Sequence, residues 1–514
     1  MNHPAFRIKD CPGTRELSLS FKRAARRRRM SSLRPALVVI DSSREGMRVY
    51  SKVDERIVDM LAEIVGSEAV VTNEEGLEPY SHDEMPGWRF MPEVVVKPGS
   101  VDEVARVVRL AARENVPVTP RGLGTGLSGG ALAVHGGVVV SMERMNRLVE
   151  VDQDNLMAVV EPGLVVGELH KQVEALGLFY PPDPASLDSC SIGGNIAENA
   201  GGPRALKYGV TRDYVMGIEA VLPDGSVVRY GGKTVKNVTG YDLANVLIGS
   251  EGTLGIVTQA ILKLIPLPQH RVDLLVPFHS FHDATRMVTE IIRAKRIVPV
   301  VLEFMDRESV KACEIYLEKE LPFSDAEAQL IVGLDGNRRE DIDAQAEIVA
   351  GLCLEGGADD VLVADNVFQK DQLWHARRVL LETLKAISER VEVEDVVVPR
   401  VRIPELISAV EEISESSGLP IVNWGHAGDG NVHVGVLKRG VSDEKWNAEL
   451  DRVNEAIFET ALSLGGMITG EHGIGIFKKR FMPKAVDEPT MAAMRVLKRA
   501  FDPAGIMNPG KVLP

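Results

Sequence analysis

The spacing of hydrophobic residues predicts two helices in the first half of the chain. From Ser100 to Asn115, apolar residues recur every three or four positions, as on the buried face of an amphipathic helix. That face consists of Val101, Val104, Val107, Val108 and Ala111. Ser100 and Glu103 have the spacing of a capping box, so we expect the helix to begin there. A second helix is expected over Val166–Leu176, ending at Gly177.

Short apolar runs around these helices predict β-strands. The runs are Val116–Thr119, Val138–Ser141, Met157–Glu161 and Ile256–Leu264. Within Gly217–Tyr230, two further runs flank Pro223-Asp224-Gly225, a sequence typical of a hairpin turn. Helices and strands thus alternate from about residue 50, which indicates an α+β domain.

The pattern changes near residue 270, where Pro266-Leu267-Pro268 interrupts it and indicates a domain boundary. Beyond this point, longer helical patterns are separated by strand-like runs at Val300–Met305, Gln329–Leu334 and Ile421–Trp424. We therefore expect a lead-in over residues 1–49, a first α+β domain over residues 50–270 and a second over residues 271–465.

Composition and charge limit the classes of protein to which the chain can belong. With 514 residues, 45% of them hydrophobic, the chain is long enough for two or three globular domains. Its 59 Lys and Arg against 74 Asp and Glu give a net charge of −15, which argues against nucleic-acid binding. No run approaches the ~18 apolar residues that a membrane helix requires.

The first 30 residues are basic, with nine Lys and Arg against two acidic residues. We expect them to form a disordered extension. A targeting or lipid-binding segment is the alternative, although the apolar run Ala36–Ile40 is too short for a signal peptide.

The four cysteines are Cys11, Cys190, Cys313 and Cys353, and no two of them form a Cys-x-x-Cys pair. The sequence therefore encodes neither a zinc ribbon nor an iron–sulfur cluster. We expect a reducing, cytoplasmic location, with any peripheral membrane association made through a partner. If the protein transfers electrons, they must pass to oxygen, to a small acceptor or to another polypeptide. The sequence leaves a homodimer open.

The segment from Pro120 to Gly130 contains five glycines within nine residues. Because no Cβ atoms block the approach, backbone N–H groups of such a loop can converge on a pyrophosphate, and Arg121, Thr125 or Ser128 could add contacts. The glycine spacing fits the Rossmann pattern, but that pattern requires a helix directly after the glycines, and the residues that follow predict a strand. The loop also lacks the Gly-Lys-Ser/Thr of a Walker motif. A flexible linker is the alternative interpretation.

Further clusters of glycine, proline and amide residues follow this loop. They are Pro181–Pro184, Ser191–Asn195, Asn199–Gly202 and Gly249–Val257. Each cluster alone is typical of a turn. Together they suit one long ligand, and they predict a bound dinucleotide.

Two histidines, His426 and His433, flank the turn sequence Asp429-Gly430. Strand-like residues surround them, so a hairpin could bring both imidazoles to one end of a two-stranded ribbon. Glu471 and His472 lie in a glycine-flanked loop about forty residues further on. A His/His/Glu set leaves coordination positions open, as a catalytic metal requires, and zinc, iron(II) and manganese(II) all accept such ligands. The alternative is that the histidines are ordinary loop residues.

These motifs resemble the FAD-binding flavoproteins of the vanillyl-alcohol oxidase (PCMH-type) family, in the branch of D-lactate dehydrogenase and the glycolate oxidase catalytic subunit. The resemblance covers residues 50–514. It implies an α+β fold in which a PCMH-type FAD-binding domain precedes a cap domain with an antiparallel sheet, and residues 466–514 return to the FAD domain. It implies flavin contacts from Pro120, Arg121, Gly122, Leu123, Gly124, Thr125, Gly126, Leu127, Ser128, Pro182, Asp183, Ser189, Gly193, Gly194, Asn195, Gly201, Glu251, Gly255, Ile256, Val257 and Asn508. The glycine loop contains no histidine for a covalent link, so we expect noncovalent FAD.

The same resemblance implies the chemistry of the site. His426, His433 and Glu471 match the residues that bind a divalent cation in the family. His472 matches the general base, which would take the proton of the substrate hydroxyl while hydride passes from C2 to flavin N5.

The resemblance also implies a substrate-binding arginine. In Trp374-His375-Ala376-Arg377, Arg377 matches the residue that binds the substrate carboxylate, and Arg378 is the fallback. Without the resemblance, either arginine would be a solvated charge on a helix. Asp395 and the pair Pro399-Arg400 match family positions to which the sequence assigns no role.

The expected substrate is a small D-2-hydroxy acid, D-lactate or glycolate. Family members that oxidise D-2-hydroxyglutarate have an asparagine and a lysine where this chain has Gly435 and Val393, which favours a monocarboxylate. D-2-hydroxyglutarate or a longer 2-hydroxy acid is the alternative. Two further alternatives are a noncatalytic flavin subunit that relays electrons and an ether-lipid-type synthase. An electron-transfer flavoprotein, a quinone, a cytochrome or an iron–sulfur subunit could each be the electron acceptor.

Overall fold

The computed structural model describes residues 49–85 and 87–514, and the chain from Tyr50 to Pro514 forms one unit. The basic extension, the run Ala36–Ile40 and Cys11 lie outside the described residues, so the predictions made for them stay untested.

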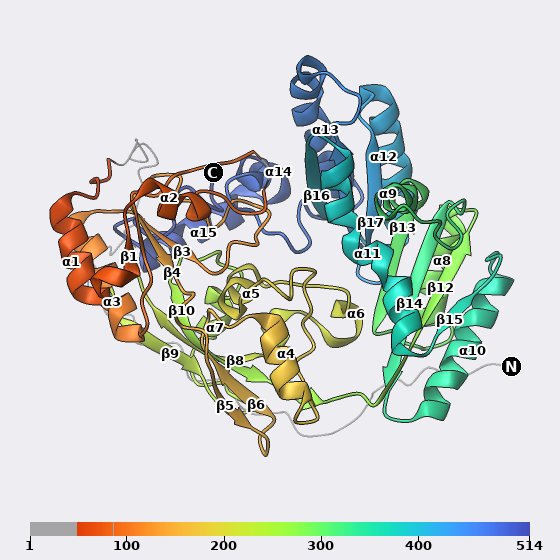
Figure 1. Ribbon diagram of the computed structural model, residues 1–514, viewed down its shortest axis with the longest axis horizontal. Coiled ribbons are helices and arrows are strands. Elements are labelled where there is room, and N and C mark those ends of the chain that lie inside the picture. Colours follow the sequence, from red (N-terminus) through yellow and green to blue (C-terminus); the bar gives the residue numbers. More distant parts are fainter. Residues whose placement is uncertain (1–48, 86) are drawn as a thin grey trace, which may run out of the picture. The chain divides into compact units, whose positions relative to one another are not determined.

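The first sheet contains a parallel set of three strands. Its strand order is β1 (Val70–Val71), β2 (Val94–Val96), β4 (Val138–Ser141), β3 (Val118–Arg121), with β1 antiparallel to β2. Helices α1 (Glu55–Val65) and α3 (Val101–Glu114) share an apolar core with this sheet, as the valine spacing of α3 predicts (Figure 1). Ser100 Oγ accepts a hydrogen bond from Glu103 N at 3.3 Å, whereas the Glu103 carboxylate accepts one from Gly99 N at 2.8 Å. In a standard capping box the Glu103 carboxylate would bond the backbone N–H of Ser100 itself; here it bonds the N–H of the residue before Ser100.

The second sheet is antiparallel and has five strands. Its order is β5 (Leu148–Asp152), β6 (Met157–Val160), β10 (Ile256–Lys263), β8 (Val215–Val221), β9 (Val227–Gly231). The β8–β9 pair is the predicted hairpin. Helices α4 (Val166–Glu174), α5 (Ile192–Glu198) and α7 (Leu243–Leu247) pack on this sheet through a common core. The first half of the chain is therefore the α+β domain that the pattern predicts.

The third sheet, in the second half of the chain, has seven antiparallel strands. Its order is β15 (Leu362–Ala364), β12 (His270–Phe278), β14 (Ala328–Gly336), β13 (Val301–Asp306), β17 (Ile421–His426), β18 (Asn431–Leu437), β16 (Val391–Val397). Its larger core lies against helices α8 (Phe281–Arg293), α10 (Arg339–Glu355), α12 (Ile403–Ser417) and α13 (Asp443–Ser463). A smaller core includes residues of α9 (Arg307–Leu317) and α11 (Val367–Ile387). The expected antiparallel cap sheet is confirmed.

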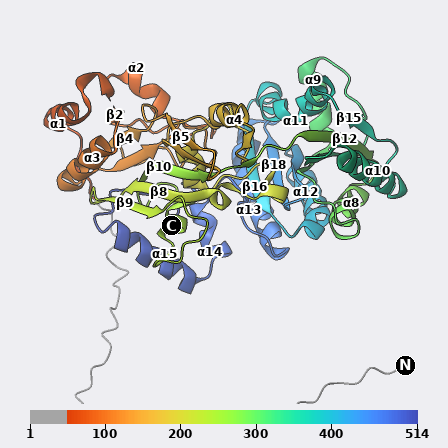
Figure 2. The same ribbon diagram turned by 90° about the horizontal axis from the view of Figure 1, so that it is seen from below.

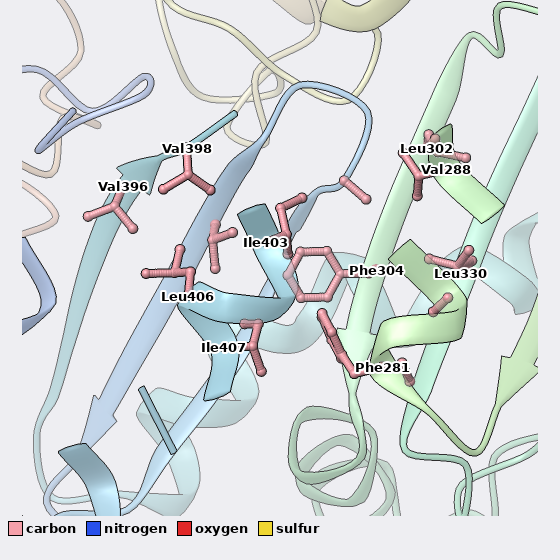
Figure 3. Close-up of a cluster of buried hydrophobic side chains, with 14 of the residues drawn as sticks. Phe281, Val288, Leu302, Phe304, Leu330, Val396, Val398, Ile403, Leu406 and Ile407 are labelled. Carbon is pink, nitrogen blue, oxygen red and sulfur yellow. The ribbon is translucent and has the colours of Figure 1, made fainter. Parts of the chain in front are cut away.

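The larger core determines which way the residues of β13 point. Leu302 and Phe304 are buried in it with α8 and α12, and the rings of Phe281 and Phe304 lie 5.2 Å apart (Figure 3). Because neighbouring residues of a strand point to opposite faces, Glu303 faces the other side of the sheet, as does Met305 in the smaller core. That side carries the polar residues of the site.

The C-terminal segment returns to the first half of the chain, as expected. Figure 2 shows α14 (Met482–Ala485) and α15 (Glu488–Phe501) on that side. Val118 N donates to Ile506 O at 2.8 Å and Asn508 N donates to Val118 O at 2.7 Å, so the segment extends the first sheet beside β3.

The remaining short elements are α2 (Glu74–Leu77), α6 (Ala205–Tyr208), β7 (Leu178–Phe179) and β11 (Ile265–Pro266). Among the helices of the described chain, none is long and apolar enough to cross a membrane. Cys190, Cys313 and Cys353 are buried free thiols.

Candidate active site

The glycine loop runs from the end of β3 at Arg121 to the start of β4 at Val138 without a helix. This is the strand–loop–strand arrangement that the sequence predicts, and it excludes a Rossmann fingerprint. A Cβ atom on Gly122 would lie 2.3 Å from Ser191 Oγ, which caps α5 by accepting a hydrogen bond from Gly194 N at 3.2 Å. The loop and the start of α5 therefore approach each other so closely that residue 122 has no room for a side chain.

A cavity of about 510 Å³ opens beside this loop, and we call it the first cavity. Most of the residues expected to contact the flavin line it. They are Pro120, Arg121, Gly122, Leu123, Gly124, Thr125, Gly126, Leu127, Ser189, Gly193, Gly194, Asn195, Gly201, Glu251, Gly255, Ile256 and Val257. The fold thus gathers segments from about 140 residues of chain around one space.

Two other expected flavin contacts lie behind the loop. Asn508 is buried and donates hydrogen bonds from Nδ2 to the carbonyl oxygens of Gly130, at 2.9 Å, and Glu251, at 2.7 Å. Ser128 is buried as well, and its carbonyl accepts a hydrogen bond from Ile476 N at 3.0 Å. Neither residue lines the first cavity. Asn508 supports the glycine loop from the C-terminal segment, and Ser128 is the loop residue to which Ile476 of that segment is bonded.

Pro182 and Asp183 also lie away from the first cavity. The Pro182 carbonyl oxygen is 3.0 Å from Nε2 of His170. Asp183 forms an ion pair with Arg204 at 2.9 Å and lines a second cavity instead. Asp183 thus faces the second cavity, whereas Pro184 of the same turn lines both cavities.

Arg121 ties the glycine loop to the segment before β2 through side-chain hydrogen bonds. Its Nη2 donates hydrogen bonds to the carbonyl oxygens of Pro79, at 3.1 Å, and His82, at 2.9 Å, and the side chain is buried. Two backbone oxygen atoms therefore already bind Nη2 of Arg121, and Nη1 is the guanidinium nitrogen that remains available to a ligand.

The residues around the first cavity fit FAD. Within the described chain, two residues that line this cavity have buried polar atoms without a hydrogen-bond partner, Nη1 of Arg121 and Nδ2 of Asn195. Buried polar atoms of this kind require a ligand or ordered water. The loop backbone without Cβ atoms suits a pyrophosphate, and the loop around these atoms supplies donors for it.

The hairpin predicted around Asp429-Gly430 is present as β17 and β18. His426 is the last residue of β17, and His433 lies two residues beyond the position that pairs with it, so both imidazoles lie on the same face. Their ring centroids are 5.4 Å apart. Glu471 Oε1 lies 3.4 Å from Nε2 of each histidine.

The donor atoms of His426, His433 and Glu471 all lie within 4.8 Å of one another, and these residues fit a divalent cation. A second group, Asp395 with His433 and His472, is equally close. Asp395 is occupied, however, because its Oδ2 already accepts hydrogen bonds from Thr469 Oγ1 and from the backbone N–H groups of residues 470, 471 and 472. The first group is therefore the better metal site.

Asp395 holds the loop that carries Glu471 and His472. The three backbone bonds measure 2.9, 3.0 and 2.9 Å, and Asn431 Nδ2 donates to Oδ1 at 2.6 Å. The side chain is fully buried. The sequence singled out Asp395 without a role, and the structure gives it one as the anchor of this loop. Pro399 and Arg400 line neither cavity.

Glu303 is a residue that the sequence analysis missed. It is fully buried on β13, directly opposite His426 in the strand register. Its Oε1 is hydrogen-bonded to His426 Nδ1, and its Oε2 accepts a bond from Arg377 Nε at 2.9 Å. The only local signal was one carboxylate within an apolar strand.

Burial and charge shift the pKa values of this cluster in different directions. Burial disfavours the charged form of His426, but the carboxylates of Glu303 and Glu471 outweigh it and raise its pKa well above the usual value. Burial lowers the pKa of His433 to about 3. For Glu471, the neighbouring histidines, His426 foremost, outweigh burial and lower its pKa to about 2. Without a cation, a proton on His426 and the guanidinium of Arg377 thus balance the carboxylates of Glu303 and Glu471.

His472 and Arg377 border the same space. The ring of His472 stacks on that of His433, with centroids 5.2 Å apart and planes 15° apart. Arg377, predicted to bind the substrate carboxylate, pairs with Glu303 through Nη2 at 2.8 Å and is largely buried. Arg378, the fallback, is exposed and pairs with Asp371 at 3.0 Å. Arg377 is therefore not a solvated helix charge, whereas Arg378 is exposed and still lines both cavities.

The second cavity, of about 600 Å³, adjoins the first. Its walls include Arg377, Trp424, His426 and His433. The residues that line both cavities include Leu127, Arg378, Leu381, Glu471 and His472. The general base and one metal ligand expected from the sequence thus lie where the two cavities meet.

Comparison with known proteins identifies the class of protein to which this fold belongs. Two protein-family models match the chain: the FAD binding domain over residues 92–231 and the C-terminal domain of FAD linked oxidases over residues 267–512. The chain is 41% identical to the glycolate oxidase subunit GlcD of Bacillus subtilis, over 89% of this chain and 96% of that protein. It is 37% identical to a D-lactate dehydrogenase of Anaerostipes hadrus, over 90% and 98%. The chain therefore belongs to the FAD-linked oxidases of the PCMH and vanillyl-alcohol oxidase family.

Solved structures share the fold. p-Cresol methylhydroxylase superposes with a TM-score of 0.74 at 18% identity, covering 88% of this chain and 96% of that one. Alkyldihydroxyacetonephosphate synthase gives a TM-score of 0.71 at 21% identity, covering 90% and 87%. At this level of identity the likeness establishes the fold alone.

Proposed function

We propose that this protein uses FAD to oxidise a small D-2-hydroxy acid, D-lactate or glycolate, to the 2-oxo acid. The observation that carries the proposal is the convergence of His426, His433 and Glu471 with His472 at the junction of the two cavities. The relatives named glycolate oxidase subunit and D-lactate dehydrogenase support it.

Each group in the site has a distinct task in this proposal. FAD, when bound, supplies the hydride acceptor, and a divalent cation, when bound, supplies a Lewis acid for the substrate hydroxyl. His426, His433 and Glu471 hold the cation. His472 accepts the hydroxyl proton, the role of a positioned imidazole in general base catalysis. Arg377 orients the substrate carboxylate with the N–H donors that Glu303 does not use.

Anaerobic mixing tests this function. We expect D-lactate or glycolate to bleach the flavin absorbance of metal-replete protein, and L-lactate to leave it unchanged, because the base and the carboxylate-binding arginine fix one face of C2. No bleaching by any 2-hydroxy acid, D-2-hydroxyglutarate included, would contradict the proposal. Admitting air afterwards tests the acceptor: slow reoxidation supports a separate quinone, cytochrome, iron–sulfur or flavoprotein acceptor, and fast reoxidation contradicts it.

A second candidate substrate is a longer 2-hydroxy acid with a polar or anionic far end, such as D-2-hydroxyglutarate. The volume of the second cavity, about 600 Å³, favours it. So does Lys370 in its wall, which has no carboxylate within 4.0 Å among the described residues. Faster bleaching by D-2-hydroxyglutarate than by D-lactate in the same experiment would select this candidate.

We propose that FAD is bound noncovalently. The only histidine among the residues lining the first cavity in the described chain is His472, which is assigned to proton transfer. Acid precipitation of the purified protein is expected to release the yellow colour into the supernatant. Colour that stays in the washed pellet would show a covalent link and contradict the proposal.

A further inference from the structure

One buried carboxylate contacts two parts of the site at once. Glu303 lies on β13, next to β17, with no exposed surface. One of its oxygen atoms is bonded to Nδ1 of His426, and the other lies 2.9 Å from Nε and 2.8 Å from Nη2 of Arg377. His426 belongs to the proposed metal site, and Arg377 is the proposed substrate arginine.

The hydrogen bond to Glu303 determines which nitrogen of the His426 imidazole can bind a metal. Because Nδ1 of His426 donates to Glu303, Nε2, which lies 3.4 Å from Glu471 Oε1, is the nitrogen that would offer its lone pair to a bound cation. A histidine that binds a metal usually donates its other N–H to a carboxylate or carbonyl, which fixes the ring and its tautomer. Glu303 meets that description.

The contact with Arg377 fixes the second group. Arg377 comes from α11, which approaches the sheet on the same side as Glu303. Arginine presents a planar fork of donors, so a carboxylate that engages Nε and Nη2 fixes the plane of the whole guanidinium. The orientation of the remaining donors toward the second cavity then depends on Glu303.

We propose that Glu303 is a positioning residue that holds His426 for the metal and Arg377 for the substrate carboxylate, and so sets the distance between the two ends of a bound 2-hydroxy acid. The Arg377 half of this inference rests on the proposed function, and the His426 half does not. The competing explanation is a buried ion pair between Glu303 and Arg377 that only stabilises the fold.

Metal binding by full-length Glu303→Gln tests the His426 half. Glutamine keeps the shape of the side chain but removes its charge. We expect Zn²⁺ affinity, measured by equilibrium dialysis, to fall about 10- to 100-fold, as for other residues that support a metal-binding histidine. The visible absorption spectrum of the Co²⁺-loaded variant is expected to change as well. Wild-type Zn²⁺ affinity with an unchanged Co²⁺ spectrum would overturn the proposal.

The matched control is Glu394→Gln. Glu394 is also fully buried in the same sheet, on the edge strand β16, but it lies on the opposite face from Asp395. Burial raises its pKa to about 8, so at neutral pH glutamine replaces a largely neutral side chain. This variant is expected to bind Zn²⁺ as the wild type does. An equal loss of affinity in both variants would mean that the fold has been loosened, and would overturn the specific role of Glu303.

Arg377 variants separate positioning from stability. Glu303→Gln leaves Arg377 buried without its anion and could unfold the chain, so Glu303→Gln/Arg377→Gln removes both charges together. We expect Zn²⁺ binding to stay weak in this double variant and to stay within about threefold of wild type in Arg377→Gln, where Glu303 still holds His426. Recovery of wild-type affinity in the double variant would support the ion-pair explanation and contradict ours.

Steady-state kinetics test the second part of the proposal, that Glu303 holds Arg377 for the substrate carboxylate. In Arg377→Gln we expect a raised KM, and in Glu303→Gln both a raised KM and a lowered kcat. If no 2-hydroxy acid is oxidised, the proposed function fails, yet the Zn²⁺ experiment still decides the His426 half. A wild-type chain that binds no divalent cation would overturn both.

Discussion

Replacing His472 with glutamine is expected to lower kcat/KM for the 2-hydroxy acid by about 10²- to 10⁴-fold, the usual contribution of a general base. The ring of His472 lines both cavities and stacks on His433, so it lies where a substrate hydroxyl would meet the metal site. Glutamine fills similar space but cannot accept the proton. FAD and metal content should stay at wild-type levels, because His472 is assigned to neither. Stopped-flow flavin reduction measures the effect on the chemical step.

His375→Gln is the control for this variant. His375 is exposed on α11, near Arg377, and lines neither cavity. It is expected to reduce the flavin as fast as the wild type. If His472→Gln also keeps the wild-type rate while binding FAD and metal, another residue takes the proton and the assignment of the base is wrong.

Glu471→Gln is expected to remove the metal. Glu471 Oε1 lies 3.4 Å from Nε2 of both His426 and His433, and these histidines lower the pKa of Glu471 and keep it ionised. Without this charge, we expect Zn²⁺ affinity to fall on the order of 100-fold or more. A cation contributes several kcal/mol of charge stabilisation, so kcat should fall about 10³-fold at 1.36 kcal/mol per factor of ten.

Metal content by elemental analysis and flavin bleaching measure the two effects in the same sample. Excess Zn²⁺ should restore part of the activity of Glu471→Gln, whereas it should not restore that of His472→Gln. Glu394→Gln again serves as the control, since its carboxylate lies on the other face of the sheet. A Glu471→Gln protein with full metal content and full activity would rule out Glu471 as a ligand.

Local patterns in the sequence predict the parts of the site that local geometry determines. Asp429-Gly430 between two strand-like runs predicts the hairpin, and the hairpin places His426 and His433 on one face. The absence of a helix after the glycine loop likewise follows from the apolar run at Val138–Ser141. These features depend on residues that are close in the chain.

The supporting residues could not be predicted in this way, because their partners are distant. Glu303 meets His426 across 123 positions, and Asp395 meets the backbone of His472 across 77. The first contact depends on the pairing of β13 with β17, and the second on the segment after Met467 lying beside β16; no local pattern encodes either. Asn508, assigned to the flavin from the resemblance, supports the loop across 378 positions for the same reason.

Anomalous X-ray diffraction from crystals of the FAD-bound protein reconstituted with Zn²⁺ tests most directly whether three side chains form one metal site. We expect a single strong anomalous peak about 2.0–2.2 Å from Nε2 of His426, Nε2 of His433 and a carboxylate oxygen of Glu471. A peak elsewhere in the chain, or no peak among these three residues at saturating Zn²⁺, would contradict it.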